Sequence, residues 1–218
     1  MKVTGNIVKE ITLGDIVIWM LFLGVIPDGD LAEMYAHCGG ERRKKIERIK
    51  PELKKRQSIG AGYLLYLLRE KFSIGAEPTV LSGGKPVFSE NESVQFNISH
   101  CGETVVLAFG KRPLGVDTEY VRSANLKLAE RFFAKEEYQY LLQLDNEMRA
   151  DVFYRIWTGK EAVVKAVGCG LSTPLNRFSV LEKTVEMSGN KYELHRQKLI
   201  LGENSLWISA AQLVEDFL

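Results

Sequence analysis

The chain contains 218 residues, of which 45% are apolar, and its 29 lysines and arginines nearly balance its 28 aspartates and glutamates, for a net charge of +1. This composition is typical of a folded globular protein and excludes a highly charged disordered chain. A charge balance so close to zero provides no overall attraction for nucleic acid. We therefore expect no nucleic-acid partner, and we look for anion sites where basic residues gather locally.

The longest apolar run covers residues 16–26, with the sequence IVIWMLFLGVI. It is too short for a membrane helix, which needs about 20 residues. Its β-branched and aromatic residues, followed by the turn-forming sequence PDGD at 27–30, predict a buried strand instead. No basic leader with a small-residue cleavage site precedes the run, so we expect neither a secretory signal nor a membrane association.

Further along the chain, helical spacing of apolar residues alternates with short runs typical of strands. The first half is predicted to contain helices at 31–36, 41–49 and 52–72, a loop at 81–86 and a strand at 94–98. Strands at 104–109 and 114–121 are predicted to form a hairpin that turns over residues 110–113. The second half is predicted to contain helices at 126–133, 135–144 and 147–167, then strands at 177–185, 193–201 and 205–213.

The same order of strand, helices and strands thus occurs twice. It predicts an α+β fold made of two similar halves, a pseudo-dimer within one chain, in which each half is a small antiparallel sheet packed against a long helix. We place the domain boundary between residues 1–112 and 113–218, with the active site at the junction, and we expect the protein to be a monomer.

Three cysteines, Cys38, Cys101 and Cys169, are an odd number and include no CxxC pair. This pattern favours reduced thiols in a cytoplasmic protein over disulfides or a zinc site. Cys101 follows His100 directly, but neighbouring side chains in an extended segment point to opposite faces, which disfavours a nucleophile–base pair. We expect Cys101 to be a small buried apolar side chain.

Two carboxylates stand out in the predicted strand at 114–121. Asp117 and Glu119 are two residues apart, so they lie on the same face of the strand. Two carboxylates side by side repel each other unless a cation lies between them, and Mg²⁺ suits such a pair together with substrate phosphate oxygens. The alternative is a solvated polar face on an edge strand.

The predicted helix at 147–167 carries three more charged candidates. Lys160 lies inside its apolar arc, where an ammonium is costly unless it emerges beside an anion. Glu161 and Lys165 lie together along one edge of that arc. The alternative for these two is a surface salt bridge between residues four apart on a helix.

Basic residues gather at 41–56, where nine lysines and arginines face three glutamates. Such a run is usually a solvated helix face, but Arg56 offers a bidentate fork for a phosphate, and Lys85 on a glycine-flanked loop offers a further charge. Ser99 and His100 end a predicted strand where both are able to donate to an anion. The alternative for His100 is a structural role.

Taken together, three motifs resemble the signature of the 4'-phosphopantetheinyl transferases: FNISH at 96–100, GVDTE at 115–119 and WTGKEAVVKAVGCGLS at 157–172. The resemblance extends to GKP at 84–86, RFF-x-K-x-E-Y at 131–138 and TPLNRFSV at 173–180. Length and layout are similar to the large monomeric type that activates nonribosomal peptide and polyketide synthetases.

The resemblance implies roles for individual residues. Asp117, Glu119 and Glu161 match the family's magnesium ligands, and Mn²⁺ is possible in place of Mg²⁺. The remaining matches are contacts to coenzyme A, except for Glu137, which matches a glutamate proposed to assist proton transfer. The coenzyme A residues are Lys165 at the diphosphate, Ser99 and His100 at the 3'-phosphate, Arg56, Lys85, and Lys45, for which Lys44 is the alternative register. Lys160 is a further candidate for coenzyme A binding, because of its place inside the apolar arc.

The implied reaction transfers the phosphopantetheine arm of coenzyme A to a serine of an acyl or peptidyl carrier protein and releases adenosine 3',5'-bisphosphate. Glu161, Glu119 and Glu137 all remain candidates for the group that accepts the serine proton. One alternative is a non-catalytic module that binds coenzyme A or a carrier protein. Another is a different Mg²⁺-dependent phosphotransferase, for which the chain lacks a P-loop.

Overall fold

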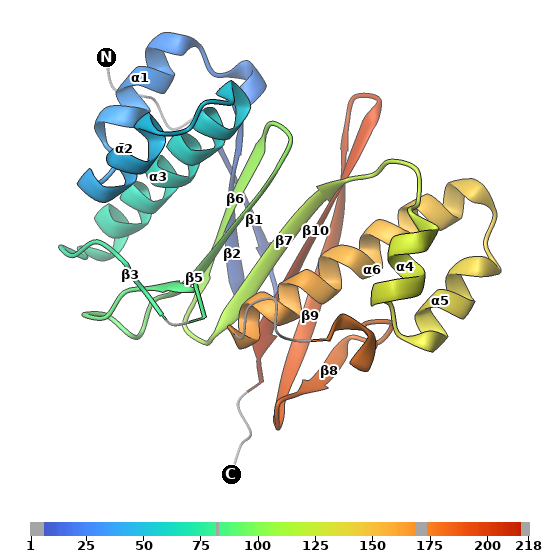
Figure 1. Ribbon diagram of the computed structural model, residues 1–218. Helices are drawn as coiled ribbons and strands as arrows, with labels where there is room; N and C mark the ends of the chain where they lie inside the picture. Colours follow the sequence, from blue (N-terminus) through green and yellow to red (C-terminus); the bar gives the residue numbers. More distant parts are fainter. Residues whose placement is uncertain (1–6, 82, 169–173, 215–218) are drawn as a thin grey trace.

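Two four-stranded antiparallel sheets form the centre of the molecule (Figure 1). The computed structural model describes residues 7–81, 83–168 and 174–214. The first sheet has the order β1 (Val8–Leu13), β2 (Ile16–Phe22), β6 (Thr104–Gly110) and β5 (Gln95–Cys101). The second has the order β7 (Leu114–Tyr120), β10 (Asn204–Leu213), β9 (Asn190–Leu201) and β8 (Thr184–Met187). Two short strands, β3 (Thr79–Val80) and β4 (Pro86–Val87), pair separately.

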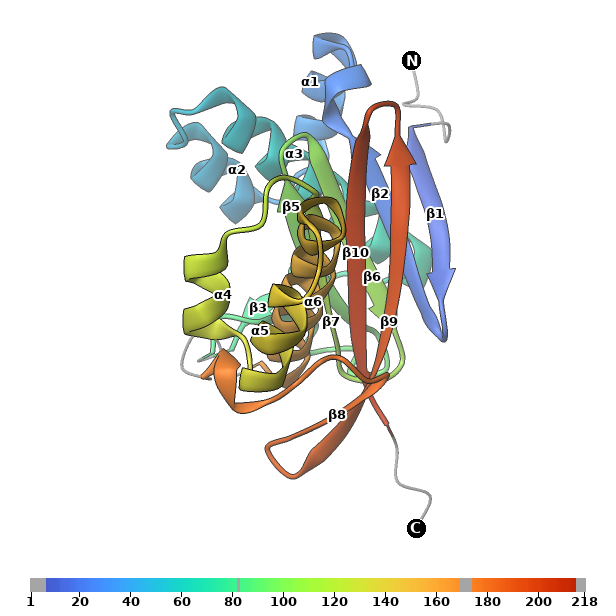
Figure 2. The same ribbon diagram turned by 90° about the vertical axis from the view of Figure 1, so that its right-hand side faces the viewer.

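Helices cover the outer face of each sheet, which gives four layers in the order helix, sheet, sheet, helix (Figures 1 and 2). The first sheet carries the short η1 (Leu23–Val25), α1 (Asp28–Ala36), α2 (Gly40–Glu47) and the long α3 (Glu52–Phe72). The second carries α4 (Leu126–Phe132), α5 (Lys135–Leu142), the long α6 (Asn146–Val167) and the short η3 (Leu175–Arg177). Among the described residues, no helix combines the length and the apolar character needed to cross a membrane.

The core between the two sheets explains the long apolar run at 16–26. Ile16, Ile18 and Met20 face the second sheet, whereas Leu21 and the following Leu23 pack in the core under α3. A strand buried on both faces is apolar at every position instead of at alternate ones. The mixed α+β class with small antiparallel sheets is thereby confirmed. The predicted boundary falls in the segment that joins β6 to β7, and the division into two similar domains stays a prediction.

Two strand predictions were wrong, and one strand was missed. The segment 104–121 is no hairpin, because β6 pairs with β5 through the tight turn at 102–103, and β7 pairs with β10 in the other sheet. β1 was not predicted, since the exposed neighbours Lys9 and Glu10 interrupt the alternation of apolar and polar residues on this edge strand. The strand predicted at 177–185 starts only at Thr184.

Edge strands β5 and β7 lie side by side where the two sheets meet (Figure 1). Within the described part of the chain, no backbone ladder joins them; side-chain hydrogen bonds from Asn97 and Ser99 on β5 reach β7 instead. The C-terminal turns of α6 lie against this junction. The fold therefore brings residues from β5, β7 and α6 into one place.

Candidate active site

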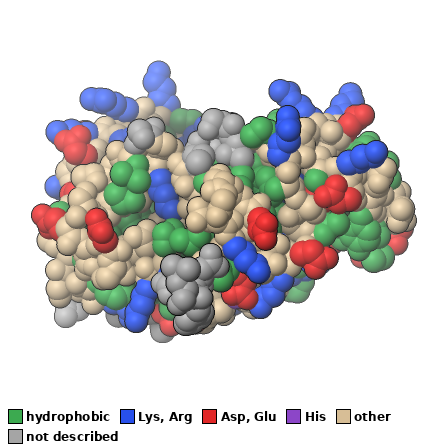
Figure 3. Space-filling view, turned by 90° about the horizontal axis from the view of Figure 1, so that it is seen from below, with side chains coloured by type: hydrophobic (Ala, Val, Ile, Leu, Met, Phe, Trp, Pro, Cys, Tyr) green, Lys and Arg blue, Asp and Glu red, His purple; other side chains and the backbone are tan. Residues whose placement is uncertain are grey.

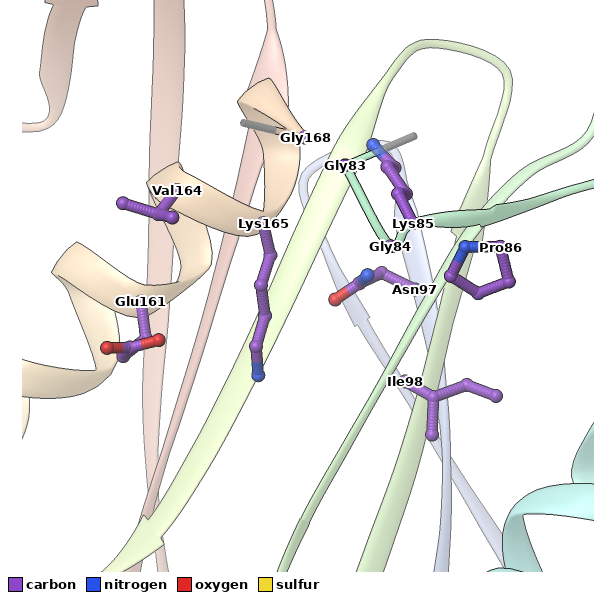
Figure 4. A pocket seen from close by; sticks show the side chains of 10 residues that line it. All are labelled: Gly83, Gly84, Lys85, Pro86, Asn97, Ile98, Glu161, Val164, Lys165 and Gly168. Atoms are coloured by element: carbon purple, nitrogen blue, oxygen red, sulfur yellow. The ribbon is translucent and has the colours of Figure 1, made fainter. Parts of the chain in front are cut away.

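A cavity of about 300 Å³ opens at the junction of β5, α6 and the loop before β4 (Figure 4). Glu161 and Lys165 project from successive turns of α6 toward the same space, and Asn97 projects from β5 across from them. The lining residues are Gly83, Gly84, Lys85, Pro86, Asn97, Ile98, Glu161, Val164, Lys165 and Gly168. The walls thus mix cationic, anionic and apolar groups, which is typical of a site for a ligand with both phosphate and apolar parts.

Lys165 is the centre of the polar cluster beside this cavity. Its Nζ donates to Asp117 Oδ1 at 2.6 Å, to Ser99 Oγ at 3.1 Å and to the carbonyl of Val116 at 3.1 Å. Ser99 Oγ in turn donates to Asp117 Oδ1 at 2.8 Å. Three residues predicted from separate motifs are therefore in direct contact. Both donors bind the same carboxylate oxygen, while Asp117 Oδ2 is buried and has no hydrogen-bond partner in the described structure.

Two more carboxylates share the negative field of Asp117. Burial raises the pKa of Glu119 and of Glu161, and the charge of Asp117 raises both further, whereas Lys165 opposes the shift. Like charges that interact in a partly buried site make the ionised form costly, and an added cation removes that cost. This mutual repulsion makes the three carboxylates an electrostatically coupled group.

The donor set of these carboxylates fits a hard divalent cation, which prefers carboxylate oxygens and completes its shell with water or phosphate. The partnerless Oδ2 of Asp117 is the sign of an acceptor in need of a positive partner. As they stand in the described residues, no three His, Cys, Asp or Glu side chains are close enough to hold one ion. Lys165 occupies the other oxygen of Asp117 in this arrangement.

His100 and Lys45 border the same cluster. His100 is exposed at the end of β5, and its pKa is lowered by partial desolvation and by the charges of Lys165 and Lys45. Lys45 therefore lies within electrostatic reach of His100. Lys44, the alternative in the sequence, instead forms an exposed ion pair with Glu41 at 2.6 Å. The geometry favours Lys45 over Lys44.

Lys85 lines the cavity, but its ammonium points toward the end of α6 (Figure 4). Its Nζ donates to the carbonyl of Leu114 at 3.0 Å and to that of Ala166 at 3.1 Å. Burial lowers the pKa of Lys85 to about 8. The ammonium thus binds a carbonyl in the last turn of α6, where a positive charge also interacts favourably with the negative end of the helix dipole.

Arg56 is bound within the first half of the molecule. Its Nη1 contacts Asp28 Oδ1 at 2.9 Å, and its Nη2 donates to the carbonyls of Leu23 and Ile26 at 2.9 and 2.8 Å. Asp28 is almost fully exposed, so the two carbonyl bonds are the stronger part of this contact. The guanidinium therefore fastens α3 to η1, and a contact of Arg56 with coenzyme A stays a prediction without geometric support.

Glu137 and Lys160 form a fully buried ion pair of 2.6 Å, away from the residues that line the cavity. Lys160 Nζ also donates to the carbonyls of Leu175 and Phe178, at 2.8 and 2.5 Å. The two oxygens of Glu137 accept the backbone N–H groups of Ala134 and Val180, both at 2.7 Å. The anion expected beside Lys160 is thus supplied by the protein itself. This geometry supports a structural task for both residues in place of the roles expected from the sequence.

Cys101 is buried, as predicted, and so is Cys38. The Sγ of Cys101 accepts the backbone N–H of Tyr120 at 3.2 Å, and burial raises the pKa of the Cys101 thiol to about 12. A thiol with so high a pKa is a poor nucleophile. The third cysteine, Cys169, lies outside the described residues.

Two functional residues were missed by the sequence analysis. Asn97 lies inside the FNISH motif, lines the cavity and accepts the backbone N–H of Val116 at 3.0 Å. Gly115 lies where β7 and α6 touch, so that a side chain there would overlap the backbone of Ala162 and Ala166. An asparagine inside a strand, which strands disfavour, and a glycine beside two carboxylates were the available signals.

Comparison with known proteins gives a consistent result. The sequence model of the 4'-phosphopantetheinyl transferase superfamily matches residues 113–205. The 4'-phosphopantetheinyl transferase ffp of Bacillus subtilis is 34% identical over 170 residues, which cover 74% of this chain and 76% of the relative. The 4'-phosphopantetheinyl transferase Sfp of Bacillus subtilis (strain 168) is 44% identical over 97 residues, 44% of this chain and 43% of the relative. The 4'-phosphopantetheinyl transferase psf-1 of Bacillus pumilus is 32% identical over 156 residues, 63% of this chain and 67% of the relative.

Proposed function

Because the chain belongs to the 4'-phosphopantetheinyl transferases, we propose that the cluster around Lys165 is where this enzyme transfers the phosphopantetheine arm of coenzyme A to a carrier-protein serine. The observation that carries the assignment is the set of three coupled carboxylates beside one lysine, with Asp117 Oδ2 buried and partnerless. Adenosine 3',5'-bisphosphate is the second product.

Coenzyme A binds in the cavity between α6 and β5. Lys165 offers its ammonium to the diphosphate, where it offsets the charge that builds on the leaving phosphate. The 3'-phosphate end of coenzyme A is bound by Ser99 and His100 on β5 and by Lys45 on α2. Ile98 and Val164 contribute apolar surface to the same cavity, which suits the uncharged parts of the ligand.

Asp117, Glu119 and Glu161 hold the divalent metal, for which we propose Mg²⁺, with Mn²⁺ as a substitute. When bound, the ion supplies positive charge that polarises the diphosphate. Protein groups do the rest, because phosphoryl transfer depends mainly on positioning and on charge stabilisation.

The serine proton needs an acceptor near the cavity. Glu161 lines it, and Glu119 lies within electrostatic reach of Glu161. A carboxylate positioned in this way is able to accept a proton directly or through one water molecule. We propose that Glu161 or Glu119 takes this proton, and we leave the buried Glu137 out.

The test uses an apo carrier protein, coenzyme A and Mg²⁺. Transfer adds the phosphopantetheine arm, about 340 Da, to the carrier, and intact-mass spectrometry detects it. Asp117→Ala is expected to abolish transfer while the chain stays folded. Glu130→Ala is the matched control, because Glu130 is an exposed carboxylate on α4 of the same half.

Near-normal turnover of Asp117→Ala would refute the assignment of the metal carboxylates. Tight binding of coenzyme A by the parent chain without transfer to any acyl or peptidyl carrier would instead point to a non-catalytic binding module. A panel of both carrier types also shows which pathway the enzyme serves.

We propose further that the enzyme acts as a monomer in the cytoplasm and without a nucleic-acid partner. The charge pattern supports the last point: on the face in Figure 3, basic and acidic side chains are interspersed and form no single basic patch. The site itself is built from strands and a helix of one chain. Sedimentation of the purified protein tests the monomer directly.

A further inference from the structure

Asn97 bridges the two sheets at the point where they meet. It lies in the middle of β5, its side chain is only 6% exposed, and its Oδ1 accepts the backbone N–H of Val116 on β7 at 3.0 Å. Val116 immediately precedes Asp117 in the chain. Ser99, two residues further along β5, binds Asp117 from the same side. Alternate residues of a strand face the same way, so Asn97 and Ser99 act as two successive side-chain links to β7.

Val116 is one of the residues of β7 whose backbone faces the junction; Tyr120, which donates its N–H to Cys101 Sγ, is another. The N–H of Val116 is bound by Asn97, and the carbonyl of Val116 accepts Lys165 Nζ at 3.1 Å. No strand pairing within the described structure joins β7 to β5, so the N–H depends on the Asn97 side chain for a partner. A buried N–H group without a partner is costly, and the strand would shift to satisfy it.

One face of β7 is fixed by direct contact with α6. Gly115 allows the backbone of the strand to touch the backbone of the helix at Ala162 and Ala166. This contact brings Lys165 close enough to reach both Val116 and Asp117. β7 is therefore held by α6 on this face, by its pairing with β10 along one edge, and by side chains of β5, Asn97 among them, along the other edge.

We propose that Asn97 is a positioning residue, which holds β7 in the place where Asp117 lies against Lys165. This inference rests on the proposed function of those two residues. Asn97 acts through the backbone of Val116, and a misplacement of about 1 Å in a positioned reaction is able to cost roughly 100-fold in rate. Its loss should therefore lower kcat far more than it changes the KM for coenzyme A.

The experiment compares Asn97→Ala, Asn97→Asp and the control Leu68→Ala. Leu68 is fully buried in α3, in the core under the first sheet, so its truncation destabilises the fold without touching the cavity. Hydrogen exchange of the Val116 amide reports the link directly, and steady-state transfer with Mg²⁺ gives kcat and KM. Thermal unfolding of each chain establishes the temperature at which all of them are folded.

Asn97→Ala is expected to speed exchange of the Val116 amide about tenfold or more, since a lost partner makes local opening easier, and to lower kcat by about 100-fold with KM little changed. Asn97→Asp keeps an acceptor oxygen and should restore the protection of Val116, although its charge faces the cavity and raises the KM for coenzyme A. Leu68→Ala should lose thermal stability but keep its kcat.

Unchanged exchange at Val116 in Asn97→Ala, or a kcat equal to that of the parent chain, would overturn the inference. An equal fall of kcat in Leu68→Ala would overturn it too, because general destabilisation would then explain the effect. A parent chain without transferase activity is a different failure, of the proposed function, and leaves the exchange experiment to decide whether Asn97 holds β7.

Discussion

The buried pair of Glu137 and Lys160 tests the structure against the sequence analysis, which assigned Glu137 to proton transfer and Lys160 to coenzyme A binding. The perturbations are Lys160→Met, Glu137→Gln and the two together. Both side chains are fully buried, so Lys160→Met leaves a carboxylate without its cation inside the protein. Removing one partner of such a pair costs about 3–5 kcal/mol of unfolding free energy.

The local contacts determine how much unfolding free energy each of the two single variants loses. Lys160→Met also removes the donor to the carbonyls of Leu175 and Phe178. Glu137→Gln keeps one carbonyl acceptor for the N–H groups of Ala134 and Val180, which the carboxylate now binds with both oxygens. The double variant no longer buries an unpaired charge, so we expect it to be more stable than Lys160→Met alone, with a coupling energy of about 1–3 kcal/mol.

Urea unfolding of the four chains measures these differences. The control is Glu136→Gln, which changes an exposed carboxylate next to Glu137 and should alter stability by no more than about 0.5 kcal/mol. Turnover is measured in parallel on the folded chains. We expect Glu137→Gln to lose stability but to keep kcat within severalfold of the parent.

The opposite pattern would refute this reasoning. A general base that is removed typically costs about 10²–10⁴ in kcat. If Glu137→Gln stayed as stable as Glu136→Gln and lost that much activity, Glu137 would be the proton acceptor that the family resemblance suggested.

Three further predictions concern the junction. The pKa of Lys85 is lowered to about 8, so the ammonium loses its charge as the pH rises through 8. The KM for coenzyme A should therefore increase between pH 7 and 9. A KM profile as flat in that range as that of Lys85→Arg would contradict a contact between Lys85 and coenzyme A. Between about pH 8 and the ordinary pKa of a lysine, Lys85 is protonated in the unfolded chain but not in the folded one. The free energy of unfolding should therefore increase as the pH rises through this range. Gly115→Ala should lower the free energy of unfolding by about 1–3 kcal/mol, because the added methyl group overlaps the backbone of α6. Gly29→Ala is the control: its methyl group would meet nothing within 4 Å, so the free energy of unfolding should not change in the same denaturation assay.

Helix periodicity predicted the long helices best. The range 52–72 is that of α3, and α6 starts one residue before the predicted 147. Both helices have a continuous apolar face with Gly60 or Gly159 inside it, so the local pattern and the tertiary packing agree. Such agreement is what makes a segment predictable from its own sequence.

Strand pairing was not predictable in the same way. Nearness along the chain favoured a hairpin of β6 with β7, but β7 pairs with β10, which lies about 90 residues further on. Nothing local to β7 encodes that partner; it follows from the packing of two sheets against each other across Val116, Ile208 and their neighbours. The site was predictable to a larger extent, because Ser99, Asp117 and Lys165 belong to motifs, yet the bridging role of Asn97 depends on the sheet junction and was invisible without it.

The two lysines of α6 show how to tell a structural ion pair from a site. Lys160 meets one carboxylate, Glu137, and every oxygen of that pair is bound by the protein. Lys165 meets Asp117, which keeps a partnerless oxygen, and the repelling carboxylates Glu119 and Glu161 add to the same field. The single positive charge of Lys165 faces three carboxylates, which leaves an excess of two negative charges. No other described residue forms an ion pair with these carboxylates. A divalent cation, as the proposed function requires, would supply that charge, so the charge imbalance distinguishes the cluster around Lys165 from the neutralised pair at Lys160.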